Sequence, residues 1–259
     1  SVFSETFDGA GFSNGPLDGQ SGWTAEPQIS LLNGFLGTNP NAFIDELGHG
    51  GSRGAGAPGT LGNFTATHSL GQTISEGLLS ATALINPSAG SQNKGGSLFL
   101  SDGGSNFLEV EALGGSGGIF TAESEFSAIS SGQIPNTLGI PFPEPLISHY
   151  VTGSPKNTFD DVAWVQVEIE YDIGAGTAVA RLRDVQEFIL PRAVRIGTAV
   201  HERPFPAFTP FDVTTVGIRS NNDFVTYPGQ IDNIEVGFVP EPATAGMMLL
   251  GMVAVVLVD

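Results

Sequence analysis

The chain contains no cysteine, so no disulfide bond holds its fold and no thiol takes part in its chemistry. It is also poor in basic residues, with 9 Lys and Arg against 27 Asp and Glu, which gives a formal net charge of −18. A protein that binds nucleic acid neutralises phosphates with basic side chains, so this balance excludes nucleic acid as a partner. An acidic chain of this kind suits solubility and the binding of divalent cations.

Charged residues make up only 14% of the chain, well below the usual ~25%. The polar surface must therefore consist mostly of Ser, Thr, Asn and Gly. Glycine and proline (36 and 17 residues) together form about a fifth of the 259 residues, which is below the roughly 25–30% typical of disordered chains. With 40% hydrophobic residues, the chain has enough apolar surface for the core of one large domain or two small ones.

No segment before residue 239 shows a sustained helical period, and short β-like runs separated by Gly, Ser or Asn turns fill most of this region. Such runs occur at 3–7, 64–70, 78–85, 97–101, 107–113, 119–126, 162–172, 177–184, 213–219 and 231–238. Many short strands at this spacing predict an antiparallel β-sandwich or a barrel. We therefore expect residues 1–238 to form one all-β domain, an antiparallel β-sandwich of the jelly-roll type.

The clearest strand is predicted over residues 162–172. Four apolar residues alternate with polar ones along it: Val165, Val167, Ile169 and Tyr171. This period of two places the apolar residues on one buried face. The turn Ile173-Gly174-Ala175-Gly176 then leads into residues 177–184, so the two segments should form a hairpin.

The end of the chain, residues 239–259, differs from everything before it. The motif Pro240-Glu241-Pro242 is followed by an unbroken small and apolar segment, Ala243 to Val258. Leu, Met and Ala favour a helix, and a proline just before a helix costs little. These 16 residues would span about 24 Å as a helix, which is short of the ~30 Å hydrocarbon core of a bilayer. We expect a hydrophobic C-terminal α-helix that either spans a membrane marginally or packs against copies of itself.

This tail resembles a PEP-CTERM sorting signal, in which Pro-Glu-Pro precedes one hydrophobic helix and a short basic cluster. The resemblance covers about the last twenty residues and departs from the pattern at Leu257-Val258-Asp259, where no basic residue occurs. It implies an exported protein of a Gram-negative bacterium, handled by an exosortase, with transient membrane insertion through the tail. Because the sequence begins at Ser1 rather than Met, we also expect that a leader has been removed. The expected location is the cell surface or the extracellular matrix.

Three pieces of residues 1–238 resemble the concanavalin A-like jelly-roll superfamily, which includes LamG-like and carbohydrate-binding-module domains. They are Glu5-Thr6-Phe7-Asp8 followed by Trp23, the strand Val165–Asp172, and the segment Gly229–Val236. In many such modules the first and last strands are neighbours, and acids on them hold a structural calcium ion. The resemblance therefore implies Ca²⁺ bound by Glu5 or Asp8 at the start and Asp232 at the end, together with main-chain oxygens. The alternative is a solvated turn acid at the start and a turn-forming Asp232-Asn233.

Acidic residues on the predicted strands raise the question of catalysis, because a glycoside hydrolase needs two carboxylates about 5–10 Å apart. Glu168, Glu170 and Asp172 share one strand face, and Glu109 and Glu111 form another pair. The Glu-x-Asp-x-x-Glu pattern of jelly-roll glucanases is absent, so we interpret these acids as solvent-facing. The 4 histidines are scattered without metal-binding spacing, and no G-x-S-x-G elbow occurs. We therefore expect no enzymatic activity.

The few basic residues are unevenly distributed. Five of them lie close together in the sequence: Arg181, Arg183, Arg192, Arg195 and Arg203. On an acidic molecule such a cluster is suited to docking the acidic face of a second copy in a head-to-tail contact. The alternative is an ordinary solvated hairpin face with local ion pairs.

Together these features predict a secreted, non-enzymatic structural protein of the cell surface or extracellular matrix that self-assembles into filaments or sheets. The predicted interface with copies of itself comprises Met247, Met248, Leu249, Leu250, Met252, Arg181, Arg183, Arg192 and Arg195. The alternative is a surface-displayed carbohydrate-binding module that holds an extracellular polysaccharide on aromatic side chains. Trp23, Trp164 and the 3 tyrosines are the aromatic residues considered for that platform.

Overall fold

The computed structural model describes residues 1–26, 29–32, 35–38, 43–45, 54–56, 64–86, 94–114, 125–131, 165–188, 193–222 and 230–239. The regular elements in these parts are all β-strands, as the sequence predicts. No helix within the described ranges has the length and apolar character needed to cross a membrane. The predicted C-terminal helix and the Pro240-Glu241-Pro242 motif lie outside the described residues, so both stay predictions.

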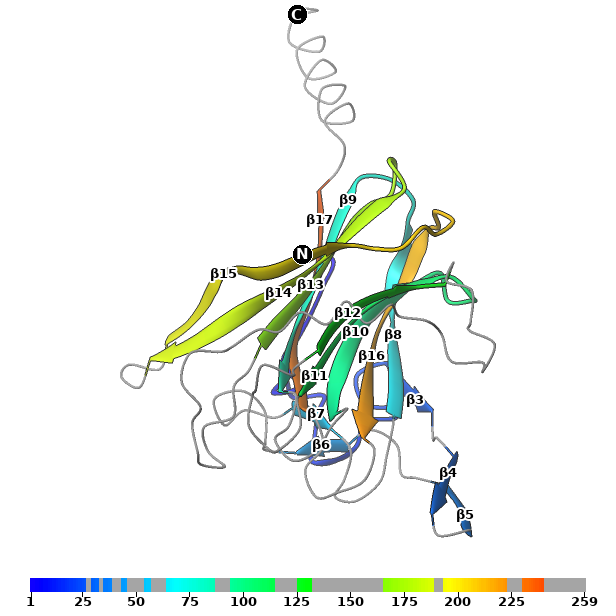
Figure 1. The fold of residues 1–259 in the computed structure, drawn as a ribbon. Coiled ribbons are helices and arrows are strands. Elements are labelled where there is room, and N and C mark those ends of the chain that lie inside the picture. The colour runs from blue at the N-terminus through cyan, green and yellow to red at the C-terminus, as the bar shows by residue number, and fades with distance from the viewer. Residues whose placement is uncertain are drawn as a thin grey trace, which may run out of the picture.

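The larger sheet, sheet A, has nine strands. Its members are β1 (Phe3–Glu5), β2 (Gly15–Pro16), β6 (Phe43–Asp45), β7 (Gly54–Gly56), β9 (Leu78–Asn86), β13 (Val165–Asp172), β14 (Thr177–Phe188), β15 (Ala193–Pro204) and β17 (Gln230–Val239). They follow the order β15-β14-β13-β9-β17-β7-β6-β2, and β1 also pairs with β17. Figure 1 shows β14 between β15 and β13 at one side of this sheet. The hairpin predicted from the alternating pattern is confirmed, because β13 and β14 pair antiparallel from Val165 opposite Asp184 to Asp172 opposite Thr177.

The smaller sheet, sheet B, has six strands. Its members are β3 (Trp23–Glu26), β8 (Phe64–Ile74), β10 (Lys94–Ser101), β11 (Phe107–Gly114), β12 (Glu125–Ser130) and β16 (Val213–Asn222). They follow the order β12-β11-β10-β16-β8-β3. A separate hairpin is formed by β4 (Ile29–Leu32) and β5 (Phe35–Thr38).

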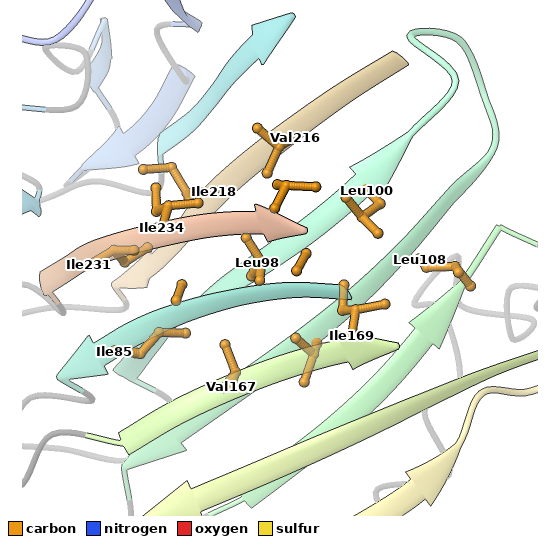
Figure 2. Packing of buried hydrophobic residues seen from close by; sticks show 14 of the residues in the cluster. Ile85, Leu98, Leu100, Leu108, Val167, Ile169, Val216, Ile218, Ile231 and Ile234 are labelled. Carbon is orange, nitrogen blue, oxygen red and sulfur yellow. The ribbon is translucent and has the colours of Figure 1, made fainter. Parts of the chain in front are cut away.

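The hydrophobic core lies between the inner faces of the two sheets. Figure 2 shows side chains of both sheets packed together there: Ile85, Val167, Ile169, Ile231 and Ile234 from sheet A, and Leu98, Leu100, Leu108, Val216 and Ile218 from sheet B. All of them are buried. Burying one aliphatic side chain of this size stabilises a fold by about 1.5–3 kcal/mol, so this layer is what holds the sheets face to face.

The two ends of the described β-region lie side by side. Phe3 on β1 is opposite Val236 on β17, and Glu5 is opposite Ile234. Two facing antiparallel sheets whose first and last strands are neighbours fit the predicted jelly roll. The predicted domain boundary between residues 238 and 239 stays a prediction; β17 itself continues to Val239.

Several strands differ from the sequence-based prediction. Strand β12 continues to Ser130, beyond the predicted end at Phe126, and β15 occupies a segment for which no strand is predicted. The pairing of β15 with β14 has register shifts around Arg183. Such irregularities interrupt the period-two alternation from which strands are recognised in a sequence.

Candidate functional site

Two of the three acids predicted to hold calcium lie on paired strands. Glu5 ends β1, and its Oε1 accepts hydrogen bonds from the next two backbone N–H groups (3.0 and 3.2 Å). Asp232 on β17 is fully buried, and its Oδ1 accepts a hydrogen bond from the N–H of Asn233 (2.7 Å). Asp8 is exposed. The described part of the chain contains no group of three His, Asp or Glu side chains that could hold a metal ion, so these acids do not gather into one.

Two of the clustered arginines lie on the outer face of sheet A in ion pairs within the chain. Arg181 on β14 contacts Glu168 (3.2 Å), Glu170 (3.0 Å) and Glu202 (2.7 Å), which lie on the neighbouring strands β13 and β15. Arg183 pairs with Glu168 (2.9 Å). We call these five residues the Arg181 network. The hydrogen bonding of its guanidinium to the Glu170 carboxylate is the main cause that raises the pKa of Arg181 above its already high ordinary value.

The sequence left two interpretations of these arginines open, docking to a second copy or local ion pairs. The Arg181 network consists of such local ion pairs. Arg192 and the tail methionines and leucines lie outside the described residues, and for Arg195 only the backbone, in β15, is described. Self-assembly through the tail and the arginine cluster therefore stays a prediction.

Two of the aromatic residues considered for a sugar platform belong to the core. Trp23 is only 1% exposed, and its ring packs against Phe3, Phe7 and His68 with centroid distances of 5.6–6.1 Å. Tyr171 is fully buried. Neither residue offers a binding surface, because their rings fill the interior of the sandwich. Trp164 and the other two tyrosines lie outside the described residues.

A different cluster of polar and aromatic side chains lies on the outer face of sheet B. It comprises Ser97 and Phe99 on β10, Phe107 and Glu109 on β11, and Gly217 and Arg219 on β16, and we call it the Arg219 platform. The neighbours of these residues along each strand, such as Leu98, Leu108 and Ile218, are buried in the core. Because side chains alternate along a strand, the platform residues point away from the core.

The ring of Phe99 forms the floor of the platform. Phe99 lies opposite Gly217 in the register of β10 and β16. A Cβ atom at position 217 would lie 2.0 Å from the Cζ of Phe99, so the ring occupies the space above this glycine. The guanidinium carbon of Arg219 lies 4.5 Å from the centroid of Phe99 and 5.5 Å from that of Phe107. A cation this close to two aromatic rings is attracted to their electron-rich faces.

Glu109 fixes the guanidinium from the side. Its Oε1 accepts a hydrogen bond from the Ser97 hydroxyl (2.5 Å), and its Oε2 forms an ion pair with Nη1 of Arg219. Glu109 is only 6% exposed. Burial raises the pKa of its carboxyl, while the charge of Arg219 and the two hydrogen bonds act in the opposite direction. Both oxygens are thus occupied, which is the arrangement of a carboxylate that positions a cation.

Arg219 leaves hydrogen-bonding capacity at the surface. Its side chain is 37% exposed, and Nη1 is the donor that bonds Glu109. Within the described residues its Nε and Nη2 groups have no hydrogen-bond partner. A guanidinium carries five N–H donors in a rigid plane, so several remain for oxygen atoms of a ligand. The partly exposed ring of Phe107 lies beside them.

The sequence pattern identifies Glu109 only as half of a carboxylate pair and predicts that it faces solvent. This prediction is wrong, because Glu109 is buried, as is Glu168 on β13. The sequence pattern does not point to Arg219, Phe99 or Phe107. Glu109 and Arg219 are 110 positions apart, and β10 separates their strands in the sheet. The register of three strands is needed to bring them together. A local signal did exist, since Phe99 and Phe107 fall on the polar side of otherwise alternating strands.

Comparison with known proteins gives no family assignment. No family model matches the chain, and no curated protein matches it. Three solved structures with similar folds are a glycosyl hydrolase family protein from Mycobacterium fortuitum, the VIP36 exoplasmic/lumenal domain in a Ca²⁺- and Man2-bound form, and lectin II from Ulex europaeus.

The measured similarities are low. For the Mycobacterium fortuitum protein the TM-score is 0.44 at 14% identity, covering 91% of this chain and 99% of that one. For VIP36 the TM-score is 0.43 at 8% identity, covering 92% of this chain and 88% of that one. For the Ulex europaeus lectin the TM-score is 0.41 at 10% identity, covering 90% of this chain and 97% of that one. Similarities of this size assign no activity to the chain.

Proposed function

We propose that this protein is an exported, non-enzymatic carbohydrate-binding domain that holds a sugar on the Arg219 platform. The observation that carries the proposal is the position of the Arg219 donors, which have no partner in the part of the chain that the structure describes, beside the ring of Phe107 on an outward sheet face. A sugar ring presents hydroxyl oxygens along its rim and apolar C–H groups on its faces. A few fixed polar groups next to an aromatic surface match both features.

The platform is suited to binding because its guanidinium is fixed before a ligand arrives. Glu109 holds Arg219 from one side, and the rings of Phe99 and Phe107 lie against it. Ordering a long side chain on binding costs about 0.5–1.5 kcal/mol, and this cost is largely met in advance here. A flexible surface lysine or arginine would lack that advantage.

The same contacts favour binding over catalysis. A retaining or inverting glycosidase needs one carboxyl that gives its proton to the leaving oxygen. Glu109 has the raised pKa expected of such an acid, but its two oxygens accept hydrogen bonds from Ser97 and Arg219. A carboxylate engaged in this way has no free oxygen from which to protonate a substrate. We therefore propose that polysaccharides are bound and not cleaved.

Export and display at the cell surface are part of the proposal and rest on the PEP-CTERM resemblance of the tail. A chain without cysteine and with only 14% charged residues is compatible with that location. Anchoring through the tail would present the β-domain to polysaccharides of the cell envelope or matrix.

The proposal is tested by glycan-array binding of the full-length protein, kept in mild detergent, and of its Arg219→Ala variant. Loss of hydrogen bonds to a charged group should lower the affinity for the bound sugar about tenfold or more. Arg183→Ala, which removes an outward arginine of sheet A, is the matched control and should bind like the unchanged protein. Circular dichroism checks that all three proteins are folded. Equal binding by the Arg219→Ala variant, or no binding by the unchanged protein, would overturn the proposal.

A further inference from the structure

The Arg219 platform contains one cationic side chain, and its charge is already compensated. Arg219 forms its ion pair with Glu109, which is buried and lies on the same outer face of sheet B, on strand β11. Glu111, two residues further along β11, is on the same face and lies opposite Ser97. The platform therefore presents hydrogen-bond donors without a surplus of positive charge.

The rest of the molecule adds to this effect. The chain has 9 basic and 27 acidic residues, which leaves a formal charge of −18. At physiological salt the screening length is about 8 Å, so the net charge of the whole molecule acts only weakly on an approaching anion, mainly through the charges that lie within that distance of the platform. An anionic ligand would also compete with Glu109 for Arg219, and a carboxylate left buried without its partner is costly.

Resting on the function proposed above, we infer that the Arg219 platform is selective for uncharged sugars and discriminates against uronate- or sulfate-bearing chains. Hydroxyl oxygens accept hydrogen bonds from Nε and Nη2 of Arg219 without disturbing its pair with Glu109. Glu109 is then a specificity-determining residue as well as a positioning one. Its charge cancels that of Arg219, so the guanidinium acts on the ligand as a set of donors instead of as a cation.

If Glu109 determines the selectivity, removal of its charge should shift the preference of the platform toward anionic sugars. Glu109→Gln keeps the side-chain shape and an oxygen that accepts from Ser97 or Arg219, but it removes the negative charge. Arg219 then becomes an uncompensated cation at the surface. We expect affinity for uronate-containing chains to rise on the order of 2–5-fold, as for a partly exposed ion pair, while affinity for neutral chains does not rise.

The experiment compares matched pairs of oligosaccharides by calorimetry with the full-length protein: oligomers of glucose, mannose and galactose, and the corresponding oligoglucuronates, oligomannuronates and oligogalacturonates. The inference predicts that the bound sugar is the neutral member of its pair and that Arg219→Ala loses it. Raising the salt from about 0.05 to 0.5 M should leave this binding nearly unchanged, because no net charge is paired across the interface.

The possible outcomes separate this inference from the proposed function. Binding of uronate oligomers in preference to neutral ones, abolished in Arg219→Ala, keeps the carbohydrate function and overturns the neutral-sugar selectivity. Absence of binding to every member of the panel overturns both. If Glu109→Gln does not fold, the salt dependence of the unchanged protein decides the question, because an ionic contact would weaken steeply over that range.

Discussion

The phenol oxygen of Tyr171 makes two hydrogen bonds to the backbone of Phe211: it donates to the carbonyl oxygen (3.0 Å) and accepts from the N–H (2.9 Å). Tyr171 lies on β13 of sheet A, and Phe211 lies two residues before the start of β16 in sheet B. The two rings are also packed, with a centroid distance of 5.5 Å. One side chain therefore joins the two sheets and satisfies a buried stretch of backbone, which would otherwise be left without partners.

Removal of this hydroxyl should destabilise the fold without changing its packing. Tyr171→Phe keeps the ring but leaves the N–H and carbonyl of Phe211 unsatisfied, which costs about 1–3 kcal/mol. Urea unfolding should show a lower midpoint with an unchanged slope, because the surface exposed on unfolding stays the same. An unchanged midpoint would mean that the backbone of Phe211 finds other partners.

Tyr171 should also make stability depend on alkaline pH. Burial is the main cause that raises its pKa above the ordinary 10.0, and the charge of Asp212 raises it further against the Phe211 hydrogen bond. The folded state therefore holds the phenol proton more tightly than the unfolded chain does. This contribution is fully present below pH about 10 and is lost as the pH rises from there through the folded-state pKa. Unfolding midpoints measured across this range should fall more steeply for the unchanged protein than for Tyr171→Phe, in which the other two tyrosines remain.

The contact between Phe99 and Gly217 in the Arg219 platform predicts that position 217 does not tolerate a side chain. In Gly217→Ala the new Cβ would lie 2.0 Å from Phe99 Cζ, so the ring would have to leave its place beneath Arg219. Overpacking of this kind costs about 1–3 kcal/mol, and the proposed sugar binding should fall with it. Gly237→Ala on β17 is the matched control, because the nearest atom to its added Cβ, the carbonyl oxygen of Ser80, is 3.9 Å away. Thermal unfolding of both variants provides the test, and equal melting temperatures would contradict the placement of Phe99.

Much of the fold was predictable because it follows local patterns, whereas the candidate site was not. The alternation from Val165 to Tyr171 and the turn after it define one hairpin without knowledge of any other segment. The Arg219 platform depends instead on the register of β10 with both β11 and β16. Glu109 could be suspected from its sequence neighbourhood, but the partner that determines its role lies 110 positions away. For Trp23 the sequence leaves two possibilities open, because an aromatic residue after a turn is equally compatible with the core and with a binding surface; the structure places it in the core.

The Arg181 network should hold the long edge strand β15 in sheet A. Arg181 is in contact with Glu168, Glu170 and Glu202, and its side chain is only 16% exposed. Replacement by methionine keeps much of the aliphatic stem but leaves three carboxylates close together, so we expect a loss of about 1–3 kcal/mol. Arg183→Met is the control with one carboxylate partner and should cost less. Urea unfolding of the two variants checks the order, and a larger loss for Arg183→Met would refute the central role of Arg181.

The raised pKa of Glu109 predicts that ligand affinity of the Arg219 platform depends on pH. Burial places this pKa above the ordinary value of 4.5, so on acidification Glu109 takes up its proton earlier than an exposed glutamate does. The neutral acid no longer compensates Arg219 and holds it less firmly, so affinity for a neutral sugar should decrease as the pH falls through this pKa. In the same range, binding of a sulfated chain, which stays charged, should become stronger because Arg219 is left as a free cation. Binding isotherms from pH 7 downward should therefore show opposite trends for the two ligands. Glu109→Gln has no proton to gain at this position and should lack the step, and a step that persists in this variant would place the titrating group elsewhere.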